Sequence, residues 1–302
     1  MDLAFALISN EDILFCSDET AYAYFEIAIF ADALNRQLSG NKWWLHKIIL
    51  SPMDDKRNLL ILIRVLKVKE DSSLLFCVVG DFPGGTLIGY DLLAEFEQRL
   101  TAIYSCASLL SMAGSKQDAF VNLCKEIVSM LLQKHQDHID SQSVDEEEFT
   151  GEAHIHYCGL SWQGLPIFSK IFDDTLICNI PLGNGISQQE MLESVLSAKL
   201  ATIVMNTVIR AQAYVHSIQI MVDPHSHFYH LINFGNLPNN HSLELYASGQ
   251  PKHVNSLFTE LMSRIQSDPT FTMPFTGDLR PYEEVKNLLS KHLMQLQDSE
   301  VN

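Results

Sequence analysis

Two stretches of the sequence, Ile8-Ser-Asn-Glu-Asp-Ile-Leu-Phe-Cys-Ser17 and Leu160-Ser-Trp-Gln-Gly-Leu-Pro-Ile-Phe-Ser169, align with each other without gaps. Each places turn residues between two apolar runs, a pattern that predicts a β-hairpin. The serines coincide, and the apolar positions correspond except where Pro166 faces Leu14. A hairpin that recurs in the second half of the chain suggests an internal repeat.

The residues after each hairpin predict one repeated order of elements. A helix follows the first hairpin to about Leu38, with Gly40 as its C-terminal glycine. Ser187 and Glu190 have the spacing of a capping box, which begins the corresponding helix, running to about Thr207. Three strands and two helices then follow in each half. The predicted strands are Leu3–Ile8, Ile13–Ser17, Trp43–Leu50, Leu59–Val68, Leu74–Phe82, His154–Leu160, Leu165–Phe172, Ala213–Val222, Phe228–Phe234 and Ser242–Ala247, and the later helices are Asp91–Leu110, Gln117–Asp140, Lys252–Gln266 and Tyr282–Gln297.

An acidic segment separates the two halves. Residues 141–152 carry five acidic side chains and no basic one, with almost no apolar periodicity. Such a segment buries too little apolar surface to offset its ordering entropy, which predicts a solvated linker. We therefore expect an α/β (α+β) fold with one domain at 1–140, a linker at 141–152 and a second domain at 153–302. Each domain is expected to hold a five-stranded, mostly antiparallel sheet in the order ββαβββαα.

This order resembles that of the longin domain, and the profilin-like layout that longin and roadblock proteins share. The resemblance spans 1–140 and again 153–297, and it rests on element order and hairpin sequence rather than on a diagnostic motif. It implies a tandem pair of longin-like domains. Such modules typically serve as platforms for small GTPases and as parts of vesicle-trafficking or lysosomal scaffolds, and some pairs act as guanine-nucleotide exchange factors. Residues 173–186 and 271–280 depart from the longin pattern; we interpret 271–280 as a strut over the sheet, with a docking segment as the alternative.

Charge and composition exclude several classes of protein. The formal net charge of −17 argues against binding to nucleic acid or anionic membrane surfaces, because both require clustered Lys and Arg. No run of about 18 uncharged apolar residues predicts a membrane span, and the N-terminal residues lack a signal-peptide pattern. The cysteines lack CxxC spacing, which favours buried, reduced thiols. We expect a cytoplasmic protein that reaches membranes through a partner.

The first helix of each half carries two apolar stripes. A surface helix needs one apolar face, so two stripes indicate burial on both sides, against the other domain or a partner protein. The alternative is that each helix is central within its own domain. The second stripes, which are our candidate partner-binding or interdomain residues, are Tyr22, Phe25 and Ile29 in the first half and Met191, Val195 and Ala198 in the second.

Histidine and glycine clusters are weaker candidates. His225, His227 and His230 lie close together in sequence, but no cysteine or second histidine pair accompanies them at zinc-site spacing. We expect a solvated polar turn there, and no bound metal or other cofactor. Gly183-Asn-Gly185 precedes a helix but lacks a phosphate-loop motif. No nucleophile elbow is present, so we predict no catalytic residue.

We therefore predict a non-enzymatic interaction scaffold that binds a small GTPase or another membrane-trafficking protein, including a role as exchange or regulatory subunit. The first helices or the sheet edges can also support homo- or hetero-oligomers. The alternative is a small-molecule- or metal-binding sensor or enzyme of profilin-like fold that uses the His225–His230 turn. A deep polar pocket with converging titratable groups would favour this alternative.

Overall fold

Each half of the chain forms a hairpin, a long helix, three strands and a terminal set of helices. The computed structural model describes residues 3–54, 57–69, 72–83, 85–112, 118–135, 153–173, 187–223 and 228–300. The first half contains β1 (Ala4–Ser9), β2 (Asp12–Cys16), α1 (Tyr22–Ser39), β3 (Trp44–Pro52), β4 (Leu59–Lys69), β5 (Ser72–Gly80), α2 (Leu87–Thr101), α3 (Cys106–Ser111) and α4 (Asp118–His135). The second half contains β6 (His154–Trp162), β7 (Leu165–Ile171), α5 (Gln188–Ala211), β8 (Ala213–Met221), β9 (Tyr229–Leu237), β10 (His241–Gly249), α6 (Pro251–Ile265) and α7 (Glu283–Glu300).

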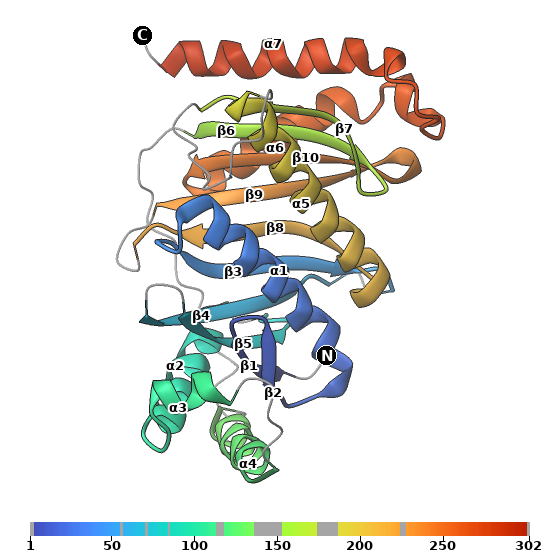
Figure 1. The fold of residues 1–302 in the computed structure, drawn as a ribbon. Helices are drawn as coiled ribbons and strands as arrows, with labels where there is room; N and C mark the ends of the chain where they lie inside the picture. The colour runs from blue at the N-terminus through green and yellow to red at the C-terminus, as the bar shows by residue number, and fades with distance from the viewer. Residues whose placement is uncertain are drawn as a thin grey trace.

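One ten-stranded antiparallel sheet runs through both halves. Its strand order is β2-β1-β5-β4-β3-β8-β9-β10-β6-β7 (Figure 1). The first five strands come from the first half, and the second half repeats their order in reverse, from β8 outward to β7. The molecule is therefore a mixed α/β protein in which β3 and β8 join the halves. The predicted linker at 141–152 lies outside the described residues.

The two hairpins have the same register, but it differs from the gapless alignment. The first turn begins after Ser9 with Asn10 at a φ of 54°, and the second begins after Trp162 with Gln163 at a φ of 46°. Ser9 therefore corresponds to Trp162, and the alignment that pairs the serines is wrong by one residue. Turn geometry sets the register of a hairpin, and identical side chains do not.

The helical region after β5 also differs from the prediction. Instead of one helix over Asp91–Leu110, α2 ends at Thr101 and α3 begins at Cys106. Ser105 adopts an extended conformation, and its Oγ accepts a hydrogen bond from the Ser108 amide at 3.1 Å, which caps a new helix. Both helices pack on the same buried cluster, so apolar residues continue at helical spacing across the break. The spacing of apolar residues alone therefore does not reveal the break.

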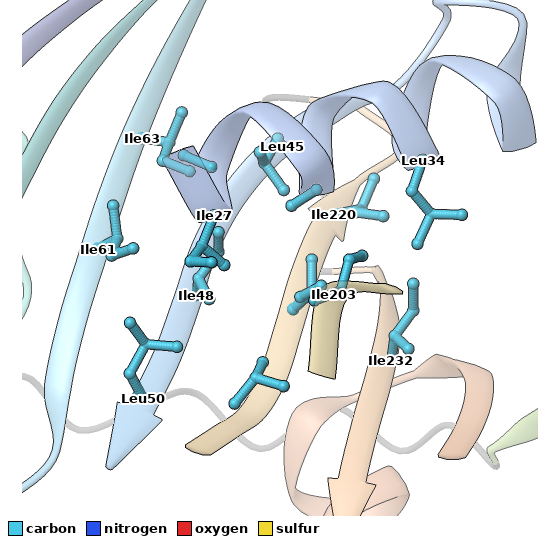
Figure 2. Close-up of a cluster of buried hydrophobic side chains, with 14 of the residues drawn as sticks. Ile27, Leu34, Leu45, Ile48, Leu50, Ile61, Ile63, Ile203, Ile220 and Ile232 are labelled. Atoms are coloured by element: carbon cyan, nitrogen blue, oxygen red, sulfur yellow. The ribbon is translucent and has the colours of Figure 1, made fainter. Parts of the chain in front are cut away.

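The helices form separate layers on the two faces of the sheet. Helices α1 and α5 cover one face and share a single buried cluster with strands of both halves. Figure 2 shows Ile27 of α1 and Ile203 of α5 over Ile48, Ile220 and Ile232 of the central strands. On the opposite face, α2, α3 and α4 pack on the strands of the first half, whereas α6 and α7 pack on those of the second.

The pairing of β3 with β8 is apolar on the face that α1 and α5 cover. Ile48 lies directly opposite Ile218, and Leu45 opposite Ile220, and all four side chains are at most 1% exposed. Burying each such side chain stabilises the fold by roughly 1.5–3 kcal/mol. The joint between the halves is therefore part of the main core.

Two features interpreted from the sequence have a defined place in the fold. Phe271, in the segment interpreted as a strut, is fully buried and packs against the rings of His241 and Tyr282 over the second half of the sheet. Helix α5 has one stretch, Gln189–Ala211, that is long and apolar enough to cross a membrane by those two measures. This stretch packs on β7, β8 and α1, as the core helix of a globular fold does.

We predict that Ile48→Ala and Ile218→Ala are energetically coupled. Each should lower the free energy of unfolding by about 2–5 kcal/mol. Because the two side chains are paired across the joint, a double-mutant cycle should give a coupling of about 0.5–3 kcal/mol. Urea denaturation of the single and double variants measures it. Ile48→Ala combined with Leu293→Ala, in a separate buried cluster of α7, is the control and should be additive; additivity of the first pair would contradict a shared core.

Candidate functional site

The six residues of the second apolar stripes differ in their exposure to solvent. Phe25 is fully buried in the cluster between α1 and the sheet, so it holds the helix in place. Tyr22 remains 46% exposed. Ile29, Met191 and Val195 are half-buried, and Ala198 is exposed. Of this set, Tyr22 and Ala198 offer accessible surface without a change in the core.

Helices α1 and α5 lie side by side on their face of the sheet (Figure 1). Arg210 of α5 donates from Nη1 to Glu26 Oε1 of α1 at 2.7 Å, and its guanidinium lies 5.9 Å from the centre of the Phe30 ring. An exposed ion pair of this kind contributes only about 0–1 kcal/mol. The buried side chains beneath the helices therefore contribute most to their alignment.

A cluster of histidines surrounds the end of β7, on the side of α5. His154 and His156 are two residues apart on β6, and Asp173 lies two residues after the end of β7. Asp173 Oδ2 lies 2.7 Å from His156 Nδ1 and 3.5 Å from His154 Nε2. The potential ligand atoms of the three residues all lie within 4.8 Å of one another. We call these three residues the β6–β7 cluster.

Main-chain pairing and a serine hydroxyl position the β6–β7 cluster. Strand β7 pairs with β6, and the Phe172 amide donates to the His156 carbonyl at 2.9 Å, which brings Asp173 beside the His156 ring. On the other side of that ring, Nε2 lies 2.8 Å from Ser248 Oγ of β10. Both nitrogens of His156 thus have a defined partner.

His230 of β9 packs between the two halves of the molecule. Its ring stacks on Trp43, with centroids 4.0 Å apart, and its Nδ1 is 2.9 Å from Tyr246 Oη. Burial lowers the pKa of His230 to about 3, and it also lowers the pKa of His156 although Asp173 opposes this. Both imidazoles are therefore neutral at physiological pH. The expectation of a solvated turn is wrong for His230, because this residue lies on a strand and is enclosed by aromatic rings.

The other histidines and the glycine loop of the sequence prediction, His225, His227 and Gly183-Asn-Gly185, lie outside the described residues. Sequence reasoning missed the β6–β7 cluster. The spacing of His154 and His156 is a usable signal, since residues two apart on a strand face the same side. Asp173 gave no such signal, because its position depends on how β6 pairs with β7.

A buried carboxyl group lies beneath α5. Glu244 of β10 accepts hydrogen bonds at Oε1 from Ser161 Oγ, at 2.7 Å, and from Ser242 Oγ. Burial outweighs these donors and raises the pKa of Glu244 to about 7. Gly159, opposite Glu244 on β6, leaves room for a tyrosine: a Cβ there would lie 2.2 Å from Tyr157 Oη.

Ser161 and Ser242 also line a pocket of about 420 Å³ at the C-terminal end of α5. Its walls are mainly apolar and come from both halves of the chain. The lining residues that carry this character are Met53, Val204, Met205, Val208, Ile209, Tyr214 and Leu237. Glu244 lies behind the two serines. The other polar lining residues include Gln163, Asn236, Asn240 and His241, whose Nε2 lies 2.7 Å from Tyr282 Oη and whose Nδ1 lies 2.8 Å from the Pro238 carbonyl.

The arrangement can bind ligands or partners, but it offers little for acid–base chemistry. Among the described residues, the pocket lining lacks a carboxylate, and the hydroxyls of its serines donate to Glu244 rather than to a histidine. No protein-family model and no curated protein sequence matches this chain. A functional proposal for this chain therefore rests on its residues and their geometry.

We predict that Glu244→Gln changes the pH dependence of stability. The folded-state pKa of about 7 exceeds the ordinary 4.5, so the folded protein binds the proton more tightly than the unfolded chain does. The contribution of Glu244 to stability therefore falls as pH rises from about 4.5 to about 7, by roughly 3 kcal/mol in all. Glutamine keeps an acceptor for the serines but does not titrate, so the variant should gain stability relative to wild type between pH 5 and 8.

Urea denaturation at pH 5, 6, 7 and 8 measures this difference. Glu126→Gln, which replaces an exposed carboxylate on α4, is the matched control, and its profile should follow that of wild type. Parallel profiles for wild type and Glu244→Gln would contradict a buried Glu244 that titrates near neutral pH.

Proposed function

We propose that this chain is a non-enzymatic scaffold, a fused pair of longin-like domains that binds a small GTPase or another membrane-trafficking protein. The observation that supports this most strongly is the repetition of β2-β1-β5-β4-β3 as β7-β6-β10-β9-β8. Together with the hairpin and helix that begin each half, this order agrees with the longin resemblance of the sequence. The β3–β8 pairing then acts as the dimer interface of such a pair within one chain.

The layer of α1 and α5 is the binding surface in this proposal. Besides Tyr22 at the start of α1, accessible apolar side chains of this layer lie at the C-terminal end of α5, where Met205 is 41% exposed and Ile209 is 67% exposed. Tyr214, at the start of β8, is 37% exposed and lines the same pocket. Methionine and tyrosine are enriched in protein interfaces, and a methionine side chain adapts its shape to a partner. We call Met205, Ile209 and Tyr214 the α5 patch.

Binding alone is sufficient for the regulatory form of this function. A protein that binds the nucleotide-free state of a GTPase more tightly than the nucleotide-bound state promotes nucleotide release. This mechanism needs a complementary surface and no side-chain chemistry, which agrees with the mainly apolar pocket. Recruitment by the GTPase would bring the protein to membranes.

The proposal predicts a state-dependent complex with a small GTPase. Affinity capture with a panel of small GTPases, each nucleotide-free, GDP-loaded and GTP-loaded, should retain the protein on at least one of them. Met205→Asp should weaken that complex about tenfold or more, because a charge in an apolar contact costs at least about 1.4 kcal/mol.

Met130→Asp is the matched control, because Met130 is 48% exposed on α4, on the opposite face of the sheet. It should bind as wild type does, and both variants should keep the wild-type circular dichroism spectrum. Equal loss in both variants would contradict the α5 patch as the contact, and the absence of binding to every GTPase in every state would contradict the function itself.

A further inference from the structure

We propose that His154, His156 and Asp173, the β6–β7 cluster, bind one zinc ion. This inference is independent of the scaffold function, and it departs from the expectation from sequence that the protein holds no metal. The ligand atoms are His154 Nε2, His156 Nδ1 and Asp173 Oδ2. The histidines lie on β6, and Asp173 lies two residues after the end of the paired strand β7. The bond from the Phe172 amide to the His156 carbonyl holds Asp173 beside β6.

The distances suit a small divalent ion. Zinc lies about 2.0–2.2 Å from nitrogen and oxygen ligands, which places the ligand atoms of a tetrahedral site roughly 3.3 Å apart. The carboxylate oxygen lies 2.7 Å from one imidazole nitrogen and 3.5 Å from the other, values on either side of that separation. The third separation, between the two imidazole nitrogens, is within 4.8 Å. Coordination therefore requires the half-exposed His154 ring to move toward His156 by roughly 1–2 Å, a rotamer adjustment at a fixed backbone.

Residues around the cluster hold His156 in the orientation that coordination requires. Metal-binding histidines usually hydrogen-bond through their second nitrogen, which fixes the tautomer. Ser248 Oγ, 2.8 Å from His156 Nε2, provides this partner. A serine hydroxyl can donate or accept, so it fits His156 both with Nδ1 protonated and with Nδ1 bound to zinc. The His230 ring, 5.2 Å from that of His156, packs beside it.

The donor set selects the class of ion. Two imidazoles and one carboxylate suit zinc and similar transition metals, whereas calcium and magnesium prefer oxygen ligands. Zinc binding at Nδ1 would require the single proton of the neutral His156 ring to lie on Nε2, where it is donated to Ser248 Oγ. His154 is 49% exposed, which gives the ion a route of entry, and Asp173 is 11% exposed. Three protein ligands leave one position of a tetrahedral site for water or another donor.

A bound ion would fasten the edge of the sheet. Within the part of the chain that the structure describes, β7 is an outer strand and pairs with β6. Coordination by Asp173 at the end of β7 and by two histidines of β6 would link the strands at the end opposite their hairpin turn. Because the ion binds the folded state, zinc should raise the midpoint of thermal unfolding.

The test uses the full-length protein after removal of metal with a chelator. Isothermal titration with zinc chloride measures stoichiometry and affinity, and the absorption spectrum with cobalt(II) reports the ligand geometry. Wild type should bind one zinc ion per chain. Asp173→Asn and His154→Gln should each weaken zinc binding by at least about tenfold, and the thermal shift with zinc should be lost.

Three controls make the outcome decisive. The Asp173→Asn variant would retain an acceptor for His156, and His154→Gln replaces a half-exposed side chain. Without metal, both variants should therefore have the same midpoint of thermal unfolding as wild type. His216→Gln, at an exposed histidine of β8, should leave zinc affinity unchanged. The proposal is overturned if wild type binds no zinc, if both site variants bind as wild type does, or if His225→Ala with His227→Ala abolishes binding that the site variants retain.

Discussion

The antiparallel pairing of β3 with β8 is the interaction on which the rest of the architecture depends. Without it, each half would end in a long apolar strand with unpaired amides and carbonyls, an arrangement that favours aggregation. Pairing satisfies those groups and buries Ile48 against Ile218 and Leu45 against Ile220. Each half thus pairs with and buries the strand that the other half would leave exposed. A polar sequence between the halves is compatible with this close association.

This pairing also accounts for the position of the two long helices. Because the second half repeats the strand order of the first in reverse, α1 and α5 lie on the same face and meet above the joint. Their shared cluster extends from Ala4 of β1 to Ile171 of β7. A helix that packs on the sheet below and on another helix beside it requires apolar residues on more than one side. Phe25 of the second stripe of α1 is buried in this way, whereas Tyr22 of the same stripe and Ala198 of α5 are exposed.

The sequence was sufficient to predict helix ends, because a helix end depends on residues that are neighbours in the sequence. Gly40 ends α1 in the left-handed conformation, and Ser187 with Glu190 forms the capping box of α5. The β3–β8 joint was beyond such reasoning, since pairing between distant strands depends on which surfaces remain uncovered after each half folds. The same reason hid the contact of His156 with Asp173 and that of Glu244 with its serines. The approach of Asp173 to His156 and of Ser161 to Glu244 follows from strand register rather than from sequence spacing, whereas Ser242 lies two residues from Glu244 on the same strand.

The outer strands show why a partner would approach the helix layer rather than the sheet edges. Strand β2 has five residues and a bulge in its pairing with β1, which shortens the available ladder. Strand β7 contains Pro166, which has no amide proton to donate, and Lys170, whose charge opposes close strand addition. Both edges therefore have features that natural sheets use to prevent edge pairing. The exposed methionine, isoleucine and tyrosine of the α5 patch lack such protection, and burial of these side chains by a partner would be favourable.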